Sequence, residues 1–90
     1  MLVSDAAIRI DKLLWFLRVA KTRSLAQEMV AAEHVRVNGR RIDRASHGVH
    51  VDDVVTFPWG SGARAIRIVT IPARRGPAIE AQSHYIGVDT

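Results

Sequence analysis

The sequence predicts a small α+β domain, in which a helix hairpin is followed by a small, mostly antiparallel sheet. Three observations support this fold class. Apolar residues recur with helical spacing in the first third of the chain, they alternate with polar residues from Val35 onward, and turn-forming pairs separate the alternating segments. The chain has 90 residues, enough for one modest core and too few for a catalytic domain beside a binding domain.

Two helices are expected first. Apolar residues at i, i+3, i+4 and i+7 predict an amphipathic helix over about residues 8–19. A polar joint over 21–24 follows, and a second helix is expected to run from there to about residue 32. Either Thr22 or Ser24 can cap this second helix, because Ser24 and Gln27 have the spacing of a capping box.

Short strands are expected over the rest of the chain. Val35 and Val37 alternate with polar residues, and Asn38-Gly39 is the preferred pair for a type I′ turn. A second alternating segment at 49–51 precedes a longer hairpin over 54–57 and 65–71, and a short helix is expected over about 77–85. The predicted core draws on the two helices and the first strand: Ile10, Leu14, Leu17, Leu25, Met29, Val35 and Val37.

Positive charge is concentrated in the first half of the chain. Thirteen Lys and Arg residues against nine Asp and Glu give a net charge of +4, and eleven of the thirteen are Arg. Nine of them lie between Arg9 and Arg44, where the chain has only four acidic residues. The planar guanidinium suits phosphate, so this half is expected to meet nucleic acid or another anionic surface. Ordinary solubilising charge is the alternative, with comparable weight on composition alone.

The basic residues are expected to form one ledge. Arg9 and Lys12 lie three residues apart on one flank of the first helix. Thr22 and Arg23 stand at the start of the second helix, where free backbone N–H groups favour a phosphate. We expect Arg9, Lys12, Arg18 and Arg23 to share one surface next to the Asn38-Gly39 turn. The alternative is a solvated face with local ion pairs, such as Asp11 with a nearby arginine.

The stretch over residues 9–57 resembles the S4-type RNA-binding domain. The matching elements are Arg9-Ile10-Asp11-Lys12-x-Leu14, Arg18, Thr22-Arg23, Ala26 with Met29-Val30, Val35-x-Val37-Asn38-Gly39 and Val49-x-x-Asp52-Asp53-x-Val55. Less specifically, Lys21-Thr22-Arg23 and Arg74-Arg75-Gly76-Pro77-Ala78, with Glu80, Ala81 and Tyr85, resemble the bacterial ribosome-associated heat-shock protein 15 family. Glu33 and Asp52 stand where that pattern has glycine, and the family's longer basic C-terminal extension has no counterpart here.

The resemblance implies an S4-like fold with an αL-type RNA-binding motif. It divides the chain into a lead-in (1–8), the S4-type domain (9–57), and a hairpin strand with a basic tail packed on the same domain (58–90). It also implies structured RNA as the partner: 23S ribosomal RNA of the large subunit and also transfer RNA, in the rescue of stalled subunits in the cytoplasm. The expected RNA contacts are the motif residues Arg9, Lys12, Arg18, Lys21, Thr22, Arg23 and Asn38, with Gln27, His34, Arg36 and Arg40 placed nearby by their positions in the sequence.

No catalytic residue, metal site, cofactor or small-molecule substrate is expected. His47, His50 and Asp52 lack the spacing of a metal site, and the adjacent Asp52 and Asp53 would face apart on a strand. The longest apolar run, Leu13–Leu17, has five residues, far below the roughly 20 that a membrane span needs. Trp15 is expected to pack beneath another segment, such as the C-terminal tail, whereas Trp59 is equally open to base stacking and to simple exposure.

Two other functions stay open on the sequence. One is an RNA-binding module that partners a separate RNA-modifying enzyme, and the other is a basic adaptor that binds acidic proteins or membrane surfaces. A steep dependence of RNA affinity on salt is expected for the RNA-binding functions, because phosphate contacts release counterions. The sequence does not define the oligomeric state.

Overall fold

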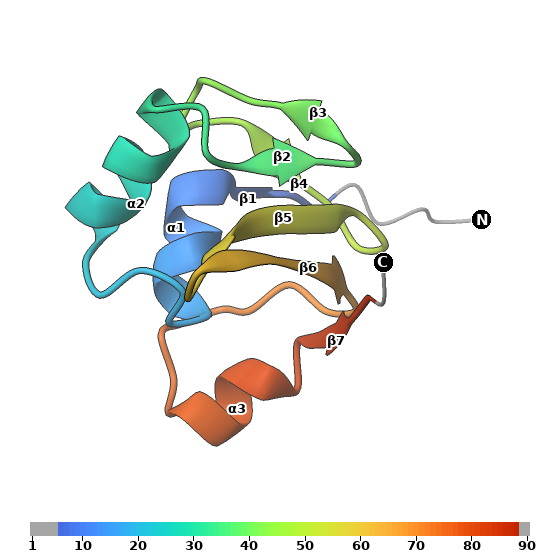
Figure 1. Ribbon diagram of the computed structural model, residues 1–90. Helices are drawn as coiled ribbons and strands as arrows, with labels where there is room; N and C mark the ends of the chain where they lie inside the picture. The colour runs from blue at the N-terminus through green and yellow to red at the C-terminus, as the bar shows by residue number, and fades with distance from the viewer. Residues whose placement is uncertain (1–5, 89–90) are drawn as a thin grey trace.

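The computed structural model describes residues 6–88 and confirms the α+β fold class (Figure 1). In chain order the elements are β1 (Ile8–Arg9), α1 (Ile10–Phe16), α2 (Arg23–Ala31), β2 (Arg36–Val37), β3 (Arg40–Arg41), β4 (Gly48–Val49), β5 (Val54–Trp59), β6 (Gly62–Ile68), α3 (Ala78–Gln82) and β7 (Tyr85–Gly87). A five-stranded antiparallel sheet has the order β3-β2-β5-β6-β7, and a two-stranded sheet pairs β1 with β4.

Helix α1 is shorter than predicted at both ends. Ile8 and Arg9 form a strand instead, pairing with Val49 and Gly48. At the other end the backbone turns left-handed at Arg18, with φ of +64°. The N–H groups of Arg18 and Val19 then donate to carbonyls one turn back, at 3.1 and 2.9 Å, which closes the helix in a Schellman motif. These local hydrogen bonds end the helix before the polar joint.

Helix α2 is capped by Thr22, so the capping box of Ser24 and Gln27 is wrong. The Thr22 hydroxyl oxygen accepts from the Leu25 N–H at 3.0 Å. The Gln27 amide points elsewhere, to Asp11. Glu33 ends this helix as Arg18 ends α1, with φ of +61°. A position where the resemblance has glycine is therefore held in the left-handed conformation that favours glycine.

The hairpins of the larger sheet are tight. Asn38 and Gly39 have φ of +54° and +82°, which confirms the type I′ turn between β2 and β3. Strand β5 extends to Trp59 and β6 begins at Gly62, so both strands reach further toward the turn than predicted and two residues close this hairpin. The predicted strand over 65–71 ends at Ile68, and the predicted C-terminal helix is short because β7 pairs with β6.

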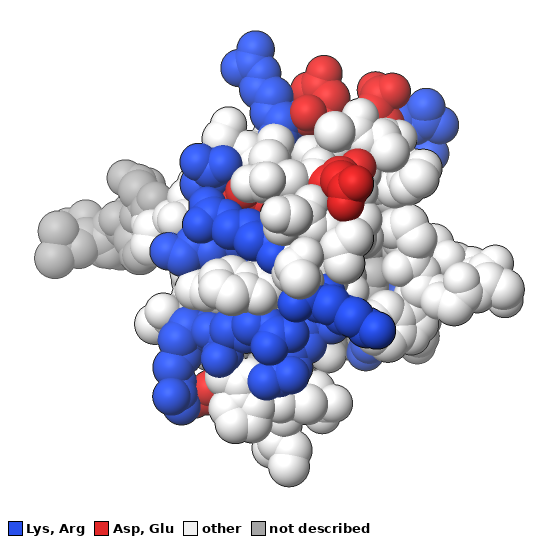
Figure 2. All heavy atoms as spheres, turned by 90° about the vertical axis from the view of Figure 1, so that its left-hand side faces the viewer, with Lys and Arg blue, Asp and Glu red and all other residues white. Residues whose placement is uncertain are grey.

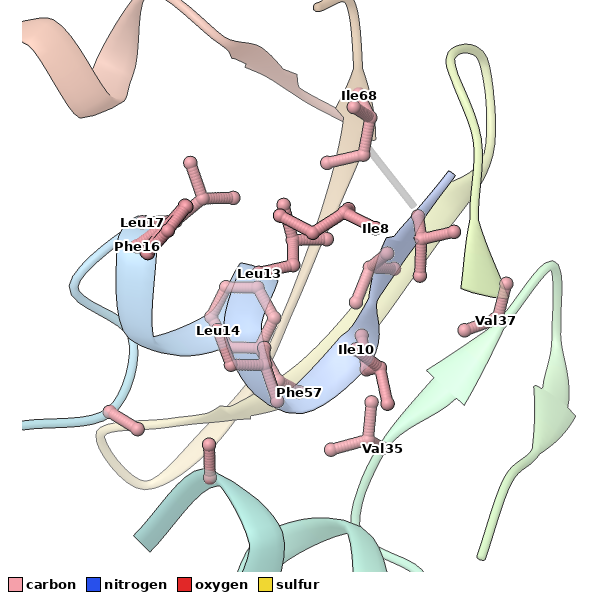
Figure 3. Close-up of a cluster of buried hydrophobic side chains, with 14 of the residues drawn as sticks. Ile8, Ile10, Leu13, Leu14, Phe16, Leu17, Val35, Val37, Phe57 and Ile68 are labelled. Atoms are coloured by element: carbon pink, nitrogen blue, oxygen red, sulfur yellow. The ribbon is translucent and has the colours of Figure 1, made fainter. Parts of the chain in front are cut away.

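The core lies between α1, α2 and one face of the larger sheet (Figure 3). Ile10, Leu14 and Leu17 are buried as predicted, together with Val35 and Val37. The prediction that Leu25 belongs to the core is wrong. Leu25 is 43% exposed, whereas Ala26 and Val30 form the buried side of α2. Met29 is partly buried against the cluster.

Strand β5 shows which face of the sheet is covered. Val55 and Phe57 are buried, and the alternate residues face the other way. Arg67 on β6 also lies on the other face, because its neighbours Ile66 and Ile68 are both buried. In residues 6–88, no helix has the length and apolar character needed to cross a membrane.

Candidate nucleic-acid interface

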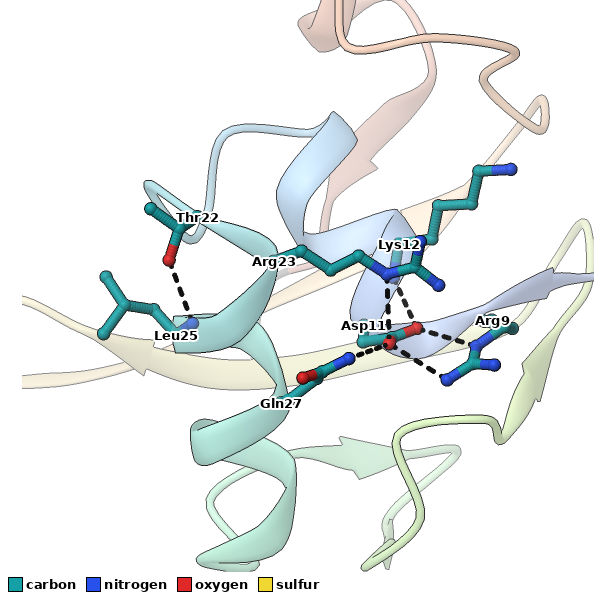
Figure 4. Close-up of polar contacts among 7 residues, drawn as sticks. All are labelled: Arg9, Asp11, Lys12, Thr22, Arg23, Leu25 and Gln27. Carbon is teal, nitrogen blue, oxygen red and sulfur yellow. Dashed lines mark hydrogen bonds and ion pairs between the residues drawn. The ribbon is translucent and has the colours of Figure 1, made fainter.

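Asp11 is the centre of a polar cluster on α1 (Figure 4). Its side chain is fully buried and accepts hydrogen bonds from three other side chains. Arg9 donates through Nε and Nη2, both at 3.1 Å, Arg23 through Nε at 3.2 Å, and Gln27 through Nε2 at 3.0 Å. The Lys12 backbone N–H adds a bond of 2.8 Å. One carboxylate therefore joins the start of α1 to the start of α2.

The cluster keeps Asp11 ionised. Burial by itself raises the pKa of this carboxyl group, but hydrogen bonds from Gln27, Arg9, Arg23 and the Lys12 N–H outweigh it and lower the pKa to about 2. At neutral pH the group is a full negative charge shared between two guanidinium groups. The predicted ion pair of Asp11 with an arginine is confirmed, with two arginines rather than one.

The same bonds hold two guanidinium groups in place at the surface. The side chains of Arg9 and Arg23 remain 49% and 40% exposed, although each donates to Asp11. A guanidinium has five N–H donors, so both keep donors directed away from Asp11. Ordered donors of this kind suit phosphate oxygens, because less side-chain entropy is lost when they bind.

A second group of cations lies along α1 and beyond its C-terminal end. Lys12 Nζ lies 5.3 Å from the centre of the Phe16 ring, one turn along the helix. Arg18 donates through Nε to the Gly76 carbonyl at 2.8 Å, and Arg75 donates to the Trp15 carbonyl at 3.0 Å. The C-terminal segment therefore lies against α1, and Trp15 packs partly buried beside the core, as expected.

Lys and Arg side chains gather on the face of the molecule that Figure 2 shows. We define the basic face as the cations linked to α1 by the contacts above: Arg9, Lys12, Arg18, Arg23 and Arg75. The sequence did not predict Arg75 as a site residue. Its position beside α1 depends on the contact with Trp15, which lies 60 positions away in the sequence.

Several predicted site residues have structural partners. Asn38 donates to Asp53 at 3.0 Å and accepts from the Val54 N–H at 2.9 Å, so its amide fastens the β2–β3 turn to the start of β5. Burial raises the pKa of Asp53, but hydrogen bonds from the His50 backbone and Asn38, with the charge of His50, lower it overall. The Thr22 hydroxyl caps α2. Contacts of Asn38 and Thr22 with RNA stay predictions.

The remaining predicted residues are exposed but do not all lie together. Lys21 is in the joint beside α2, whereas Arg40 lines a depression with Arg41, Arg44 and His47. His34 and Arg36 line another depression beside Thr56 and Pro58, on the outer face of the sheet. The structure thus distributes these four predicted RNA-binding residues over more than one surface, whereas the four cations of the predicted ledge all belong to the basic face.

The described part of the chain holds no group of three or more His, Asp or Glu side chains arranged for a metal ion. His50 and Asp53 face each other, with 3.7 Å between Nδ1 and Oδ2.

A family model for the S4 domain matches residues 8–55, which include α1, α2 and the whole Asp11 cluster. The chain belongs to the S4 domain family. It is also similar to heat shock protein 15 of Escherichia coli strain K12, with 37% identity over 87% of this chain and 58% of the relative. It therefore spans less than two thirds of that relative's length.

The other comparisons extend this result. The trimeric structure of Vibrio cholerae heat shock protein 15 superposes with a TM-score of 0.86 and 37% identity, over 92% of this chain and 83% of that one. The small ribosomal subunit protein uS4 of Opitutus terrae is 38% identical over 64% of this chain and 29% of its own length. The likeness to heat shock protein 15 thus continues past the S4 domain into the C-terminal segment that packs on α1.

Proposed function

We propose that this protein binds structured RNA without catalysing a reaction, through the basic face built on Asp11. The observation that carries the proposal is the pair of guanidinium groups that one buried carboxylate holds at the surface. Phosphate contacts from such groups fix the register of a protein on an RNA backbone. Membership of the S4 domain family supports RNA as the ligand.

The proposed target is 23S ribosomal RNA on the large ribosomal subunit. The support is the similarity to heat shock protein 15, together with the position of Arg75 beside α1. On this proposal the protein acts in the cytoplasm in the rescue or recycling of stalled subunits that still carry peptidyl-tRNA. The Asp11 cluster, Arg18 and Arg75 would contact one stretch of RNA backbone.

The test is sedimentation of the purified protein with separated large and small ribosomal subunits. We expect it to travel with the large subunit, and to do so more strongly when that subunit carries peptidyl-tRNA. Equal association with both subunits would contradict the proposed target, because a diffuse charge effect does not distinguish them. Binding to an RNA-modifying enzyme, in the absence of ribosomal RNA, would favour the alternative of a partner module.

A further inference from the structure

We propose that Trp59 is a platform on which one unpaired RNA base stacks. The proposal rests on the proposed function and adds the kind of RNA that is preferred: a helix interrupted by unpaired nucleotides rather than a continuous duplex. The observation behind it is a stack of Trp59, Arg64 and Tyr85 at one end of the larger sheet.

Trp59 lies on the same face of the sheet as the core. Val55 and Phe57 are buried on β5, and alternation places Trp59 on their side. Trp59 is the last residue of the strand, opposite Gly62, and it extends past the core with 51% of its surface exposed. Helix α1 packs on this same face, so the indole belongs to the side of the sheet that carries the basic face.

Neighbouring side chains hold the indole from one side. The guanidinium carbon of Arg64 lies 5.7 Å from the centre of the Trp59 ring and 5.4 Å from that of Tyr85. The Phe57 ring meets Trp59 edge-on, with centres 5.9 Å apart and planes at 79°. A large ring ordered in this way loses little conformational entropy when a base stacks on it. The cation beneath the ring also interacts favourably with its π-system.

The turn beside the platform is open, and the chain segment that contains it has no acidic residue. Gly60 lies in the turn and Gly62 follows it, and there is nothing within 4 Å of the position that a Cβ atom would take at either. Between Asp53 and Glu80 the chain has four arginines and no acidic residue. An RNA strand can therefore bring a base to Trp59 past an unobstructed turn, in a chain segment whose only charged side chains are arginines.

The test compares two RNA probes that share one stem: a hairpin with a single-stranded loop, and a blunt duplex of the stem alone. We expect Trp59→Ala to weaken hairpin binding by about 5- to 150-fold, as for the loss of one base stacked on an aromatic ring, and to leave duplex binding unchanged. The salt dependence should keep its slope, because no phosphate contact is lost.

Three further variants complete the experiment. Trp59→Phe should retain most of the hairpin affinity, because a ring remains, and Trp59→Leu should lose it, although an apolar side chain remains. Ile86→Ala is the matched control, since Ile86 is 50% exposed on the same sheet and has no ring. It should bind both probes like the wild type.

Equal losses on hairpin and duplex, or no loss on the hairpin, would overturn the stacking platform. A change in oligomeric state of Trp59→Ala, measured by sedimentation, would assign the indole to a contact between copies and overturn it as well. Failure of the wild-type protein to bind either probe would instead overturn the proposed function on which this inference rests.

Discussion

Replacing Asp11 by Asn tests whether one buried carboxylate organises the basic face. Folding lowers the pKa of Asp11 from 3.8 to about 2, so its ionised form stabilises the folded state by about 2 kcal/mol. We expect the free energy of unfolding of Asp11→Asn to fall by about that amount at neutral pH. The side chain is fully buried, so little of this difference is lost to solvent screening.

The effect on stability depends on pH in a defined direction. Because the folded-state pKa is the lower one, the contribution is complete above about pH 4 and disappears as the pH falls through about 2. Urea denaturation should therefore show a difference between wild type and Asp11→Asn that is largest at neutral pH and vanishes near pH 2. Asp43→Asn is the control, since it removes the same charge from an exposed residue.

The RNA affinity of Asp11→Asn distinguishes a role of Asp11 in positioning the arginines from a simple effect of its charge. Asp11→Asn raises the net charge by one, so charge alone predicts tighter binding and a steeper salt dependence. If Asp11 positions Arg9 and Arg23, both side chains are free to move in the variant and must be ordered when RNA binds. Ordering them costs about 0.5–1.5 kcal/mol each, so affinity falls by about 5- to 150-fold. Fluorescence anisotropy with a labelled RNA hairpin measures the difference. Tighter binding by a folded Asp11→Asn variant would refute the positioning role.

Three more predictions concern the backbone, the turn and the absence of catalysis. Glu33→Gly should raise the free energy of unfolding by about 1 kcal/mol, because Glu33 sits at φ of +61°; an unchanged urea midpoint would contradict this. Asn38→Ala should lower stability by about 0.5–1.5 kcal/mol, since it removes the hydrogen bonds that Asn38 makes with Asp53 and the Val54 N–H, and an unchanged stability would remove the structural role of Asn38. Purified protein should neither cleave nor modify ribosomal RNA, and a chelator should leave RNA binding unchanged; turnover that a point mutation abolishes would overturn this prediction.

The sequence correctly predicted those elements whose conformation is decided by residues close together in the chain. The helical spacing around Leu14 identified α1, and Asn38-Gly39 identified a turn that the structure confirms. Element ends were less accurate, because tertiary pairing decides them. Ile8 and Arg9 belong to a strand since Val49 and Gly48 are available to pair with them, and no local signal encodes that contact.

Strand β7 was not predicted for a similar reason. Tyr85–Gly87 is three residues long, too short for alternation to be recognised, and it forms a strand because β6 offers a free edge. Leu25 was assigned to the buried side of the second helix together with Ala26, Met29 and Val30, but only Ala26 and Val30 are fully buried there. Leu25 lies at the edge of that side, and which edge residue is covered depends on how α2 packs and not on its own sequence.

The sequence predicted which cations belong to the candidate site better than it predicted the contacts that hold them in place. Arg9, Lys12 and Arg23 were expected from charge and resemblance, and they meet around α1. The burial of Asp11 was not expected, because an acidic residue among cations looks like an ordinary surface ion pair in a sequence. Arg75 joins the basic face only through the fold of the C-terminal segment.

The most direct test of the basic face is the salt dependence of RNA affinity in Arg23→Ala and Arg67→Ala. Each variant removes one guanidinium, but Arg23 belongs to the Asp11 cluster while Arg67 is exposed on the opposite face of the sheet. We expect Arg23→Ala to bind an RNA hairpin more weakly and to lose about one unit of the log–log salt slope, with Arg67→Ala close to wild type. Equal losses of affinity with equal slopes would show that binding is a diffuse charge effect, and would contradict a phosphate-binding face built on Asp11.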